Sequence, residues 1–349
     1  MEELNLTSIK KKTFLSVNFG CRVNAAETNL FSQYLINQGF IPTKTNPGII
    51  FVNTCSITKK GANESIRKIK SLKKQYPRSF IVATGCAQVE KLDNFCNFIY
   101  FDNKTKEKLL NNLASSYTPN IKDKFTKSRR FILKIQSGCT NFCSYCIVPQ
   151  RRSYLWSLPP KEAISTVNKA VANGYKELII TGINLNQYHY SFPNLIQKLL
   201  EHTSIELISF GSVPLNSIDD DFISLYKNPE FNPRLNNFLH IPLQSGSDKI
   251  LKLMNRKYNR KKIDRIFSQL KTLPNLEFGT DIIVGFPGED DSDFQETLNL
   301  CRHVGFKKIH TFRYSPRPGT LAAKLFIKNS KISPQVLKQR SRQIRASLI

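Results

Sequence analysis

Three cysteines lie close together near the middle of the chain, in the segment Cys139-Thr-Asn-Phe-Cys143-Ser-Tyr-Cys146. Thiolates are soft ligands that suit zinc or iron–sulfur clusters. A structural zinc site is normally closed by four ligands, but no fourth Cys or His follows within this loop. A cluster held by three protein ligands would keep one metal ion open for a small molecule. The spacing therefore predicts a catalytic iron–sulfur site, with a structural zinc site as the alternative.

Three further cysteines each come shortly after an apolar segment that has the composition of a β-strand. The predicted strands are Thr13–Asn18, Ile49–Asn53 and Phe80–Thr84, and the cysteines that follow them are Cys21, Cys55 and Cys86. Apolar residues at helical spacing predict helices between these strands, at Ala25–Gln38 and Lys59–Tyr76. The alternation of strands and helices predicts a parallel sheet, here a Rossmann-like or flavodoxin-like α/β domain over residues 11–108.

Parallel strands end at the same edge of a sheet, and such sheets bind ligands beyond that edge. We therefore expect Cys21, Cys55 and Cys86 to converge on a shared metal site. The alternative is that all three are buried as small hydrophobic residues. The repeated Gly-Cys or Thr-Cys sequence after the strands favours the metal site.

The pattern of strands and helices starts again after a polar linker, which we expect at residues 109–128. Strands are predicted at Phe131–Gln136, Lys176–Thr181, Glu206–Phe210, Phe238–Leu243, Leu276–Val284 and Lys308–Tyr314. Helices are predicted between them at Lys161–Ala172, Leu195–His202, Ile218–Tyr226, Arg260–Leu270 and Ser292–Val304. These repeats are too few for an eight-stranded barrel and predict a partial (β/α)6 barrel over residues 129–335, with its site at the carboxyl ends of the strands. Residues 336–349 are expected to form a basic tail.

The two remaining cysteines are expected to have packing roles. Cys96 lies within the apolar segment Asn94–Tyr100 and is expected in a core strand. Cys301 lies in the middle of a predicted helix and is expected in the core. Disulfides are rare in cytosolic proteins, so we expect none among the cysteines of this chain.

The chain has 349 residues, of which 40% are hydrophobic, so it can form a substantial core and is not disordered as a whole. Its 52 Lys and Arg against 26 Asp and Glu give a net charge of +26. Nucleic acid is the first expectation for a partner and an acidic membrane surface the second. The alternative is a composition bias, with charges spread over solvated faces. No apolar run is long enough to cross a membrane, and Met1-Glu2-Glu3 does not begin a secretory signal, so the expected location is the cytoplasm.

The context of the cysteine motif resembles that of the radical S-adenosylmethionine (SAM) methylthiotransferase family. The matching segments follow the family's order along most of the chain. They are Gly20-Cys21-Arg-Val-Asn24, Asn53-Thr-Cys55, Gly85-Cys86, Lys134-Ile-Gln-Ser-Gly-Cys139 onward to Pro149, Leu178-Ile-Ile-Thr-Gly182, His240-Ile-Pro-Leu-Gln-Ser-Gly246 and Asp281-Ile-Ile-Val-Gly-Phe-Pro-Gly-Glu289.

This resemblance implies two [4Fe–4S] clusters and SAM as cofactors. Cys139, Cys143 and Cys146 would hold the catalytic radical SAM cluster. Cys21, Cys55 and Cys86 would hold an auxiliary cluster that supplies sulfur. Contacts to SAM are implied for Tyr145, Thr181, Gly182, Gln244, Ser245, Asp281 and Gly285. For the strand-end residues among them, ordinary strand-to-loop polarity is the alternative.

Members of the family modify either an adenosine beside the tRNA anticodon or an aspartate of a ribosomal protein. The segment Gly20-Cys21-Arg-Val-Asn24-Ala-Ala-Glu27-Thr28 resembles the branch that acts on N6-threonylcarbamoyladenosine in tRNA. The resemblance thus implies insertion of a methylthio group at C2 of this adenosine, with two SAM molecules consumed. The isopentenyladenosine enzyme and the ribosomal-protein enzyme are the alternatives within the family. An inactive tRNA-binding iron–sulfur protein is the alternative outside enzymes.

The implied partners are the tRNA anticodon loop, an electron donor such as flavodoxin or ferredoxin, and a sulfur-supply system, without a membrane. RNA contacts are expected from basic residues beside the cysteine motif, on the basic helix of the first domain and in the C-terminal tail. These residues are Arg151, Arg152, Lys68, Arg340, Arg342 and Arg345. For the basic helix, a solvated face is the alternative.

Two features depart from the family pattern. The family's Pro-x-x-Arg-Gly is here Pro149-Gln-Arg-Arg152-Ser153, and a positive φ at the position of the glycine would strain Ser153. Family members usually continue into a small β-barrel RNA-binding (TRAM) domain, which we do not expect here because the sequence stops at Ile349. We therefore expect weaker and more salt-sensitive binding of tRNA.

Overall fold

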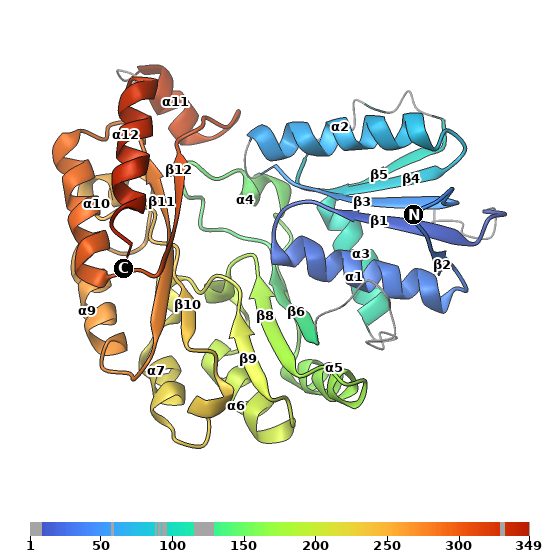
Figure 1. Ribbon diagram of the computed structural model, residues 1–349, viewed down its shortest axis with the longest axis horizontal. Helices are drawn as coiled ribbons and strands as arrows, with labels where there is room; N and C mark the ends of the chain where they lie inside the picture. Colours follow the sequence, from blue (N-terminus) through green and yellow to red (C-terminus); the bar gives the residue numbers. More distant parts are fainter. Residues whose placement is uncertain are drawn as a thin grey trace. The chain divides into compact units, whose positions relative to one another are not determined.

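The computed structural model of the protein describes residues 9–56, 59–87, 89, 92, 96–114, 129–328 and 332–348. The chain forms two compact units, which Figure 1 shows together. Unit 1 comprises Met1–Lys127 and Gln150–Leu155, and unit 2 comprises Ser128–Pro149 and Trp156–Ile349. The short segment Gln150–Leu155, which follows the cysteine motif, thus belongs to unit 1. The sequence did not predict that a segment between two parts of unit 2 would belong to unit 1.

Unit 1 is built on a parallel five-stranded sheet with the strand order β2-β1-β3-β4-β5. Its strands are β1 (Thr13–Asn18), β2 (Ile41–Pro42), β3 (Ile49–Thr54), β4 (Phe80–Gly85) and β5 (Phe98–Phe101). Its helices are α1 (Arg22–Asn37), α2 (Lys59–Gln75) and α3 (Asn103–Ala114). This is the strand order of flavodoxin-like sheets, whose ligand crevice lies where the order reverses, here between β1 and β3. The predicted parallel-sheet domain is confirmed.

Both faces of this sheet are covered by helices (Figure 1). Phe51 of β3 packs with Phe31 of α1, with ring centroids 4.1 Å apart, in a cluster that Leu110 of α3 joins. The next residue, Val52, packs with Ile69 of α2 on the other face. Because side chains of a strand alternate between faces, β3 is buried throughout, and its sequence is a nearly continuous apolar run.

The strand register places the ends of β1, β3 and β4 at one edge of the sheet. Asn18 pairs with Asn53, and Thr54 pairs with Gly85. The loops that begin with or contain the three cysteines of unit 1 therefore leave the sheet together. Gly85 has a φ of +107°, and a Cβ at this position would collide with the backbone of Thr54. Only glycine fits directly before Cys86.

Unit 2 contains six parallel strands, β6 (Arg130–Ser137), β8 (Glu177–Gly182), β9 (Leu207–Phe210), β10 (Phe238–His240), β11 (Glu277–Val284) and β12 (Lys308–Arg313). They form a sheet β7-β6-β8-β9 and a sheet β10-β11-β12. Single bridges, such as that between Ser212 and His240, connect the two sheets. The short β7 (Trp156–Ser157) pairs antiparallel with β6. This is the order expected for a partial (β/α)6 barrel.

The helices of unit 2 are α4 (Val148–Arg151, which continues into unit 1), α5 (Pro160–Ala172), α6 (Phe192–His202), α7 (Asp220–Lys227), α8 (Asp248–Leu253), α9 (Arg260–Leu270), α10 (Asp291–Val304), α11 (Leu321–Lys328) and α12 (Pro334–Arg345). Phe278 of β11 packs edge-on against Phe267 of α9, with ring centroids 5.2 Å apart. Because side chains of a strand alternate, Asp281 points to the opposite face, toward the interior of the barrel.

Three expectations from the sequence are corrected. The C-terminal segment is not a tail, because α12 begins at Pro334 and buries Arg340, Ser341 and Ile344. The linker begins later than residue 109, because α3 continues to Ala114, and residues 115–128 lie outside the described residues. Cys96 is exposed in a turn before β5 instead of lying in a core strand. Cys301 is buried in α10, as expected.

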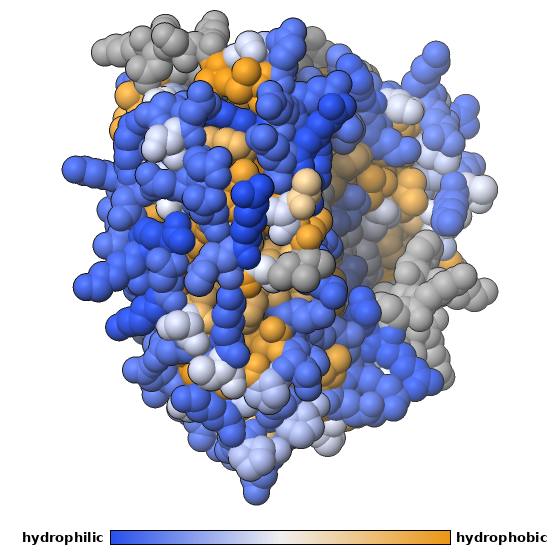
Figure 2. All heavy atoms as spheres, turned by 60° about the vertical axis from the view of Figure 1, so that its left-hand side comes forward, coloured by the Kyte–Doolittle hydropathy of each residue, from blue (hydrophilic) through white to orange (hydrophobic). Residues whose placement is uncertain are grey.

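The surface of the molecule agrees with its charged composition. Hydrophilic side chains cover most of the face shown in Figure 2. Within the described residues, no helix combines the length and the apolar composition that a membrane crossing requires.

Candidate functional site

The cysteine motif of unit 2 begins where β6 ends. A register shift between Lys134 and Gln136 interrupts the pairing with β8, and Gly138 then takes a φ of +84°. The Gln136 side-chain amide donates to the carbonyls of Ser137 and Gly138 at 2.9 and 2.8 Å. Its side-chain oxygen accepts from the backbone N–H of Asn184 at 2.8 Å. Irregularities of this kind commonly redirect side chains beside active sites, and here Gln136 fixes the turn that presents the motif.

Each sulfur atom of the motif accepts a hydrogen bond from an N–H group. Cys139 accepts from Asn184 Nδ2 and from the backbone N–H of Asn141, both at 3.5 Å. Cys143 accepts from Arg256 Nη1 at 3.5 Å, and Cys146 accepts from the backbone N–H of Val148 at 3.4 Å. N–H donors stabilise negative charge on sulfur and orient metal ligands. The three sulfur atoms are therefore in surroundings that suit metal-bound thiolates.

Burial acts in the opposite direction on the free thiols. It raises the pKa of Cys139, and it raises the pKa of Cys146 to about 12. Both thiols would thus keep their protons at neutral pH without a metal. Because a metal-bound thiol is deprotonated, loading of this site releases protons.

Arg256 lies on the loop between α8 and α9 and contacts two residues of the cysteine motif. Its guanidinium lies 3.5 Å from the Tyr145 hydroxyl and 2.8 Å from the Tyr258 hydroxyl, in addition to its contact with Cys143. Burial alone would lower the pKa of Arg256, but Tyr145, Tyr258 and Cys143 raise it above its usual value. Arg256 was not predicted from the sequence, because its contact with Cys143 is determined by the tertiary fold.

Four of the residues expected to contact SAM are partly exposed, namely Tyr145, Gly182, Gln244 and Asp281. Asp281 Oδ1 lies 3.0 Å from His240 Nε2 and 3.1 Å from His310 Nδ1. The sequence analysis quoted His240 only as part of a motif and missed His310. These two contacts orient the Asp281 carboxylate within the barrel.

The other three expected SAM contacts, Thr181, Ser245 and Gly285, are buried. The Ser245 hydroxyl lies 3.1 Å from Thr297 Oγ1 of α10 and accepts from the backbone N–H of Ser247 at 3.2 Å. The Gly285 backbone N–H donates to Glu289 at 2.7 Å. The Ser245 hydroxyl and the Gly285 N–H thus have protein partners in the described structure.

In unit 1, Cys55 and Cys86 are buried and Cys21 is partly exposed. Gly20, with a φ of +94°, lies against Cys55, because a Cβ at Gly20 would come within 2.8 Å of the Cys55 sulfur. The Cys21 sulfur lies 4.0 Å from Asn24 Oδ1. The close approach of two cysteine-bearing loops explains why glycine precedes Cys21.

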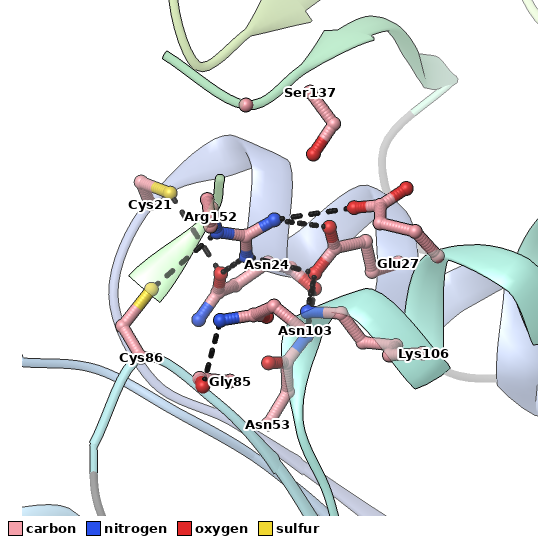
Figure 3. A network of polar contacts seen from close by, with 12 residues as sticks. Cys21, Asn24, Glu27, Asn53, Gly85, Cys86, Asn103, Lys106, Ser137 and Arg152 are labelled. Atoms are coloured by element: carbon pink, nitrogen blue, oxygen red, sulfur yellow. Dashed lines mark hydrogen bonds and ion pairs between the residues drawn. The ribbon is translucent and has the colours of Figure 1, made fainter. Parts of the chain in front are cut away.

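Arg152 lies at the centre of a buried polar network in unit 1 (Figure 3), and its side chain is only 1% exposed. Its Nη1 and Nη2 contact the two oxygens of Glu27 at 2.7 and 3.1 Å, and Nη2 donates to Asn24 Oδ1 at 2.8 Å. Its Nε donates to the Cys86 sulfur at 3.4 Å. The guanidinium therefore connects a buried carboxylate with one of the three cysteines.

Two more charged side chains join this network. Lys106 Nζ lies 2.6 Å from Glu27 Oε2, and Glu107 Oε1 lies 3.4 Å from Arg152 Nη1. Burial, together with the charge of Arg152, lowers the pKa of Lys106. Burial would also lower the pKa of Arg152, but Glu27 and Cys86 raise it well above its usual value. Arg152 is the more firmly charged of the two cations.

These contacts correct two of the expected RNA contacts. Arg152 is buried in the network of unit 1, and Arg340 is buried in ion pairs with Glu289 and Asp291, each at 2.6 Å. Neither guanidinium is available to a phosphate. Lys68, Arg342 and Arg345 are exposed, and Arg151 is partly exposed. Ser153 does not have a positive φ, so the replacement of the family's glycine causes no strain there.

The cysteine sets fit clusters better than a single metal ion. Thiolates on one zinc ion lie within about 4 Å of one another, since Zn–S bonds are about 2.3 Å long. In the described part of the chain, the only three candidate ligands whose ligand atoms all lie within 4.8 Å of one another are those of His240, Asp281 and His310, and neither set of three cysteines meets this distance. The wider cysteine sets are suited to a [4Fe–4S] cube, which distributes its ligands over several metal ions.

Comparison with known protein families finds two matches that follow the two units. The radical SAM superfamily matches residues 133–301. The uncharacterized protein family UPF0004 matches residues 13–103.

Several curated relatives match over most of their length. A threonylcarbamoyladenosine tRNA methylthiotransferase (MtaB) from Chlamydia pneumoniae is 33% identical, over 96% of this chain and 81% of the relative. The MtaB of Thermotoga maritima is 32% identical, over 90% of this chain and 77% of the relative. A tRNA-2-methylthio-N(6)-dimethylallyladenosine synthase from Pelagibacter ubique is 32% identical, over 94% of this chain and 80% of the relative.

Solved structures with a similar fold include the radical SAM methyltransferase TsrM from Kitasatospora setae, with a TM-score of 0.63 and 10% identity over 97% of this chain and 91% of that one. The cobalamin-dependent radical SAM enzyme OxsB has a TM-score of 0.57 and 12% identity, over 97% of this chain and 56% of that one. At these identities the likeness concerns the fold alone.

The partial barrel and the three-cysteine loop at its carboxyl edge define a radical SAM enzyme, which uses SAM and a [4Fe–4S] cluster. The sequence identity to curated relatives identifies the family within this class of enzymes. The chain belongs to the radical SAM methylthiotransferase family.

Proposed function

We propose that this protein inserts a methylthio group at C2 of N6-threonylcarbamoyladenosine, next to the anticodon of tRNA. The observation that carries the proposal is that one chain of this family has two sets of three cysteines, each following the carboxyl ends of parallel strands. The residues around Cys21 support the threonylcarbamoyl substrate, because Arg-Val-Asn24 and Glu27-Thr28 resemble that branch. Two of the curated relatives described above are threonylcarbamoyladenosine tRNA methylthiotransferases.

In this proposal, Cys139, Cys143 and Cys146 hold the radical SAM cluster, and Cys21, Cys55 and Cys86 hold an auxiliary [4Fe–4S] cluster. When bound, these clusters and SAM supply the radical chemistry and the sulfur. The protein residues orient and shield them. Asn184 and Arg256 donate to the sulfur atoms of the first set, while Arg152 donates to Cys86 in the second. Tyr145, Gly182, Gln244 and Asp281 are the partly exposed candidates for SAM contacts.

The partners in this proposal are tRNA, an electron donor such as flavodoxin or ferredoxin, and a sulfur-supply system, all acting in the cytoplasm. Lys68, Arg151, Arg342 and Arg345 are the candidates for RNA contacts. A second candidate substrate is isopentenyladenosine in tRNA. The 32% identity to the dimethylallyladenosine synthase of Pelagibacter ubique favours it nearly as much as the first.

The test is mass spectrometry of tRNA nucleosides from a host without its own methylthiotransferases. The host receives the wild-type gene or the Cys143→Ala variant as a matched control. We expect 2-methylthio-N6-threonylcarbamoyladenosine with the wild-type gene only. Appearance of the isopentenyl product instead would replace the substrate and keep the chemistry. If neither nucleoside appears while the protein is produced and binds iron, the tRNA proposal is wrong.

A further inference from the structure

The buried network around Arg152 joins the segment Gln150–Leu155 to the cysteine-bearing edge of unit 1. Asn103 Nδ2 donates to the Arg151 carbonyl at 3.0 Å and to the Gly85 carbonyl at 2.9 Å. This second anchor lies directly beside Cys86. The position of Arg152 is thus fixed both through its backbone neighbour and through its side chain.

Asn24 connects the same guanidinium with the loops of the other two cysteines. Its Oδ1 accepts from Arg152, while its Nδ2 donates to the carbonyls of Phe19 and Thr54, both at 2.8 Å. Phe19 precedes the Gly20-Cys21 pair, and Thr54 precedes Cys55. One buried side chain therefore links the backbone before Cys21 and before Cys55 to Arg152, which itself contacts Cys86 (Figure 3 shows the contacts of Arg152 with Asn24 and Cys86).

Among the described residues, the formal charges of the four ion-paired side chains around Arg152 cancel. Arg152 and Lys106 are paired with Glu27 and Glu107, and all four side chains are at most 3% exposed. Stability alone is a weak reason for such an arrangement, because well-packed apolar residues often replace a buried ion pair without loss. What apolar residues cannot supply is a charged N–H donor at the Cys86 sulfur.

We propose that Arg152 is a positioning residue for the auxiliary cluster, which donates its Nε–H to the Cys86 sulfur and thereby sets the reduction potential of that cluster. This inference rests on the proposed function, in so far as Cys21, Cys55 and Cys86 must hold a cluster. Reduction adds an electron and makes the cluster more negative. A cation and a hydrogen-bond donor at a ligating sulfur stabilise the reduced form more than the oxidised form.

The experiment isolates the auxiliary cluster within the full chain. A Cys139→Ala/Cys143→Ala/Cys146→Ala background removes the radical SAM cluster, and the remaining cluster is titrated with mediators while its electron paramagnetic resonance (EPR) signal is followed. In this background we compare Arg152→Met and Arg152→Lys. The methionine removes the charge and the donor, and the lysine keeps the charge but not the Nε donor. We expect a more negative midpoint potential for both, with the larger shift for Arg152→Met.

Two controls separate this role from structural damage. Arg340→Met removes another buried arginine from its ion pairs in unit 2, and we expect the potential to be unchanged. Arg152→Met/Glu27→Gln removes one positive and one negative charge and restores the charge balance of the network. We expect its potential to stay below that of the background, because the donor to Cys86 is still missing. A full return to the background value would contradict the role of that contact.

A second readout needs no change at Arg152. Arginine labelled with ¹⁵N in the same background should give a ¹⁵N hyperfine coupling to the reduced cluster, because Arg152 Nε lies 3.4 Å from a ligating sulfur. Absence of that coupling overturns the inference even if the Arg152 variants do not fold. An unshifted potential in Arg152→Met with a loaded cluster also overturns it, and leaves the proposed function intact. A background chain without cluster iron would instead contradict the proposed function itself.

Discussion

At the scale of single residues, the cysteine sulfur atoms accept hydrogen bonds from N–H groups of both neighbouring and distant residues in the sequence. The sulfur atoms of Cys139 and Cys146 each accept from a backbone N–H only two residues away, whereas the side-chain donors to Cys139 and Cys143 lie 45 and 113 residues away. The charged donor to Cys86 lies 66 residues away. Local sequence thus brings the sulfur atoms together, and distant segments supply the groups that adjust their chemistry.

Replacement of one motif cysteine should remove one cluster and spare the other. We expect Cys143→Ala to lower the iron content from about eight to about four per chain, because each [4Fe–4S] cluster carries four irons. The variant should also form no 5′-deoxyadenosine from SAM under reducing conditions. Cys301→Ala, at a cysteine buried in α10, is the control and should keep its iron. An iron content that is unaffected by Cys143→Ala would show that the motif does not hold a cluster.

Arg256 should matter although it ligates nothing. Arg256→Met removes the donor to Cys143 and the anchors at Tyr145 and Tyr258. Loss of a group that orients a metal ligand typically costs about 10–100-fold in metal affinity or activity. We expect a fall of this size in the rate of SAM cleavage, and faster loss of iron to a chelator. Arg265→Met on the exposed side of α9 serves as the control. Equal rates in both variants would rule out this role.

The side chains that contact the cysteines from distant segments of the chain could not be predicted from the sequence. The cysteines are visible because their type, their spacing and the preceding strands are all local features. Arg152 was assigned to RNA because it lies in a basic stretch, and nothing in that stretch reveals Glu27, which lies 125 residues earlier. Arg256 and His310 were missed for the same reason. Their partners are determined by the tertiary fold, and a single sequence does not contain that pairing.

At the scale of elements, the sequence predicted strands and helices well where apolar patterns were long. β1 and α9 have the predicted bounds. Short elements without a pattern were missed, including β2, β7 and α8. The sequence predicted a tail at α12 because the basic residues of this segment outnumber its apolar ones. In the structure, the buried Ile344 and the ion pairs of Arg340 attach α12 to the rest of unit 2. Composition alone cannot show which charged residues of a helix find a buried partner.

The glycine at the end of β4 should be essential for the site in unit 1. Gly85→Ala forces a side chain into a positive φ and against the backbone of Thr54. Such strain costs about 1–3 kcal/mol, and relief of the clash would displace Cys86. We expect the iron content to fall to about four per chain, with SAM cleavage retained. Gly39→Ala is a matched control, because Gly39 also has a positive φ but nothing within 4 Å of its Cβ position. Equal iron loss in both variants would point to unfolding instead.

The attachment of α12 should depend on the ion pair between Arg340 and Glu289, in which both side chains are nearly buried. Loss of one partner of a buried pair costs about 3–5 kcal/mol, so we expect Arg340→Met to lower the midpoint of urea unfolding strongly. Arg342→Met, an exposed neighbour on α12, should change the free energy of unfolding by at most about 0.5 kcal/mol. Similar midpoints for the two variants would contradict the importance of the pair.

The same variant should also change the pH dependence of stability. Burial raises the pKa of Glu289, and Arg340 opposes that rise. Without Arg340, the pKa of Glu289 in the folded state rises further above its unfolded value. The folded state then binds the proton more tightly, so stability is lost as pH increases through this raised pKa. We expect the destabilisation by Arg340→Met to be smaller at about pH 5 than at about pH 8. An equal loss at both values would show that Glu289 does not respond to Arg340.

At the scale of the whole molecule, the net charge of +26 attracts polyanions electrostatically. Part of the positive charge is neutralised internally, because Arg152 and Arg340 are buried in ion pairs. The cations that remain exposed act over a distance of about 10 Å at moderate salt. Binding of tRNA to this chain should therefore be dominated by counterion release.

Counterion release predicts how tRNA binding changes with salt concentration and which residues contribute to it. The logarithm of the tRNA association constant should fall linearly with the logarithm of the salt concentration, by about 0.7–0.9 for each phosphate contact. If Lys68 on the exposed face of α2 is such a contact, Lys68→Ala reduces the slope by about that amount. Lys169→Ala on α5 removes the same charge from another exposed helix and is the control for net charge. Identical slopes for the two variants would mean that Lys68 acts only through the overall field. A slope near zero in the unchanged chain would remove counterion release, and with it the electrostatic argument for an RNA partner.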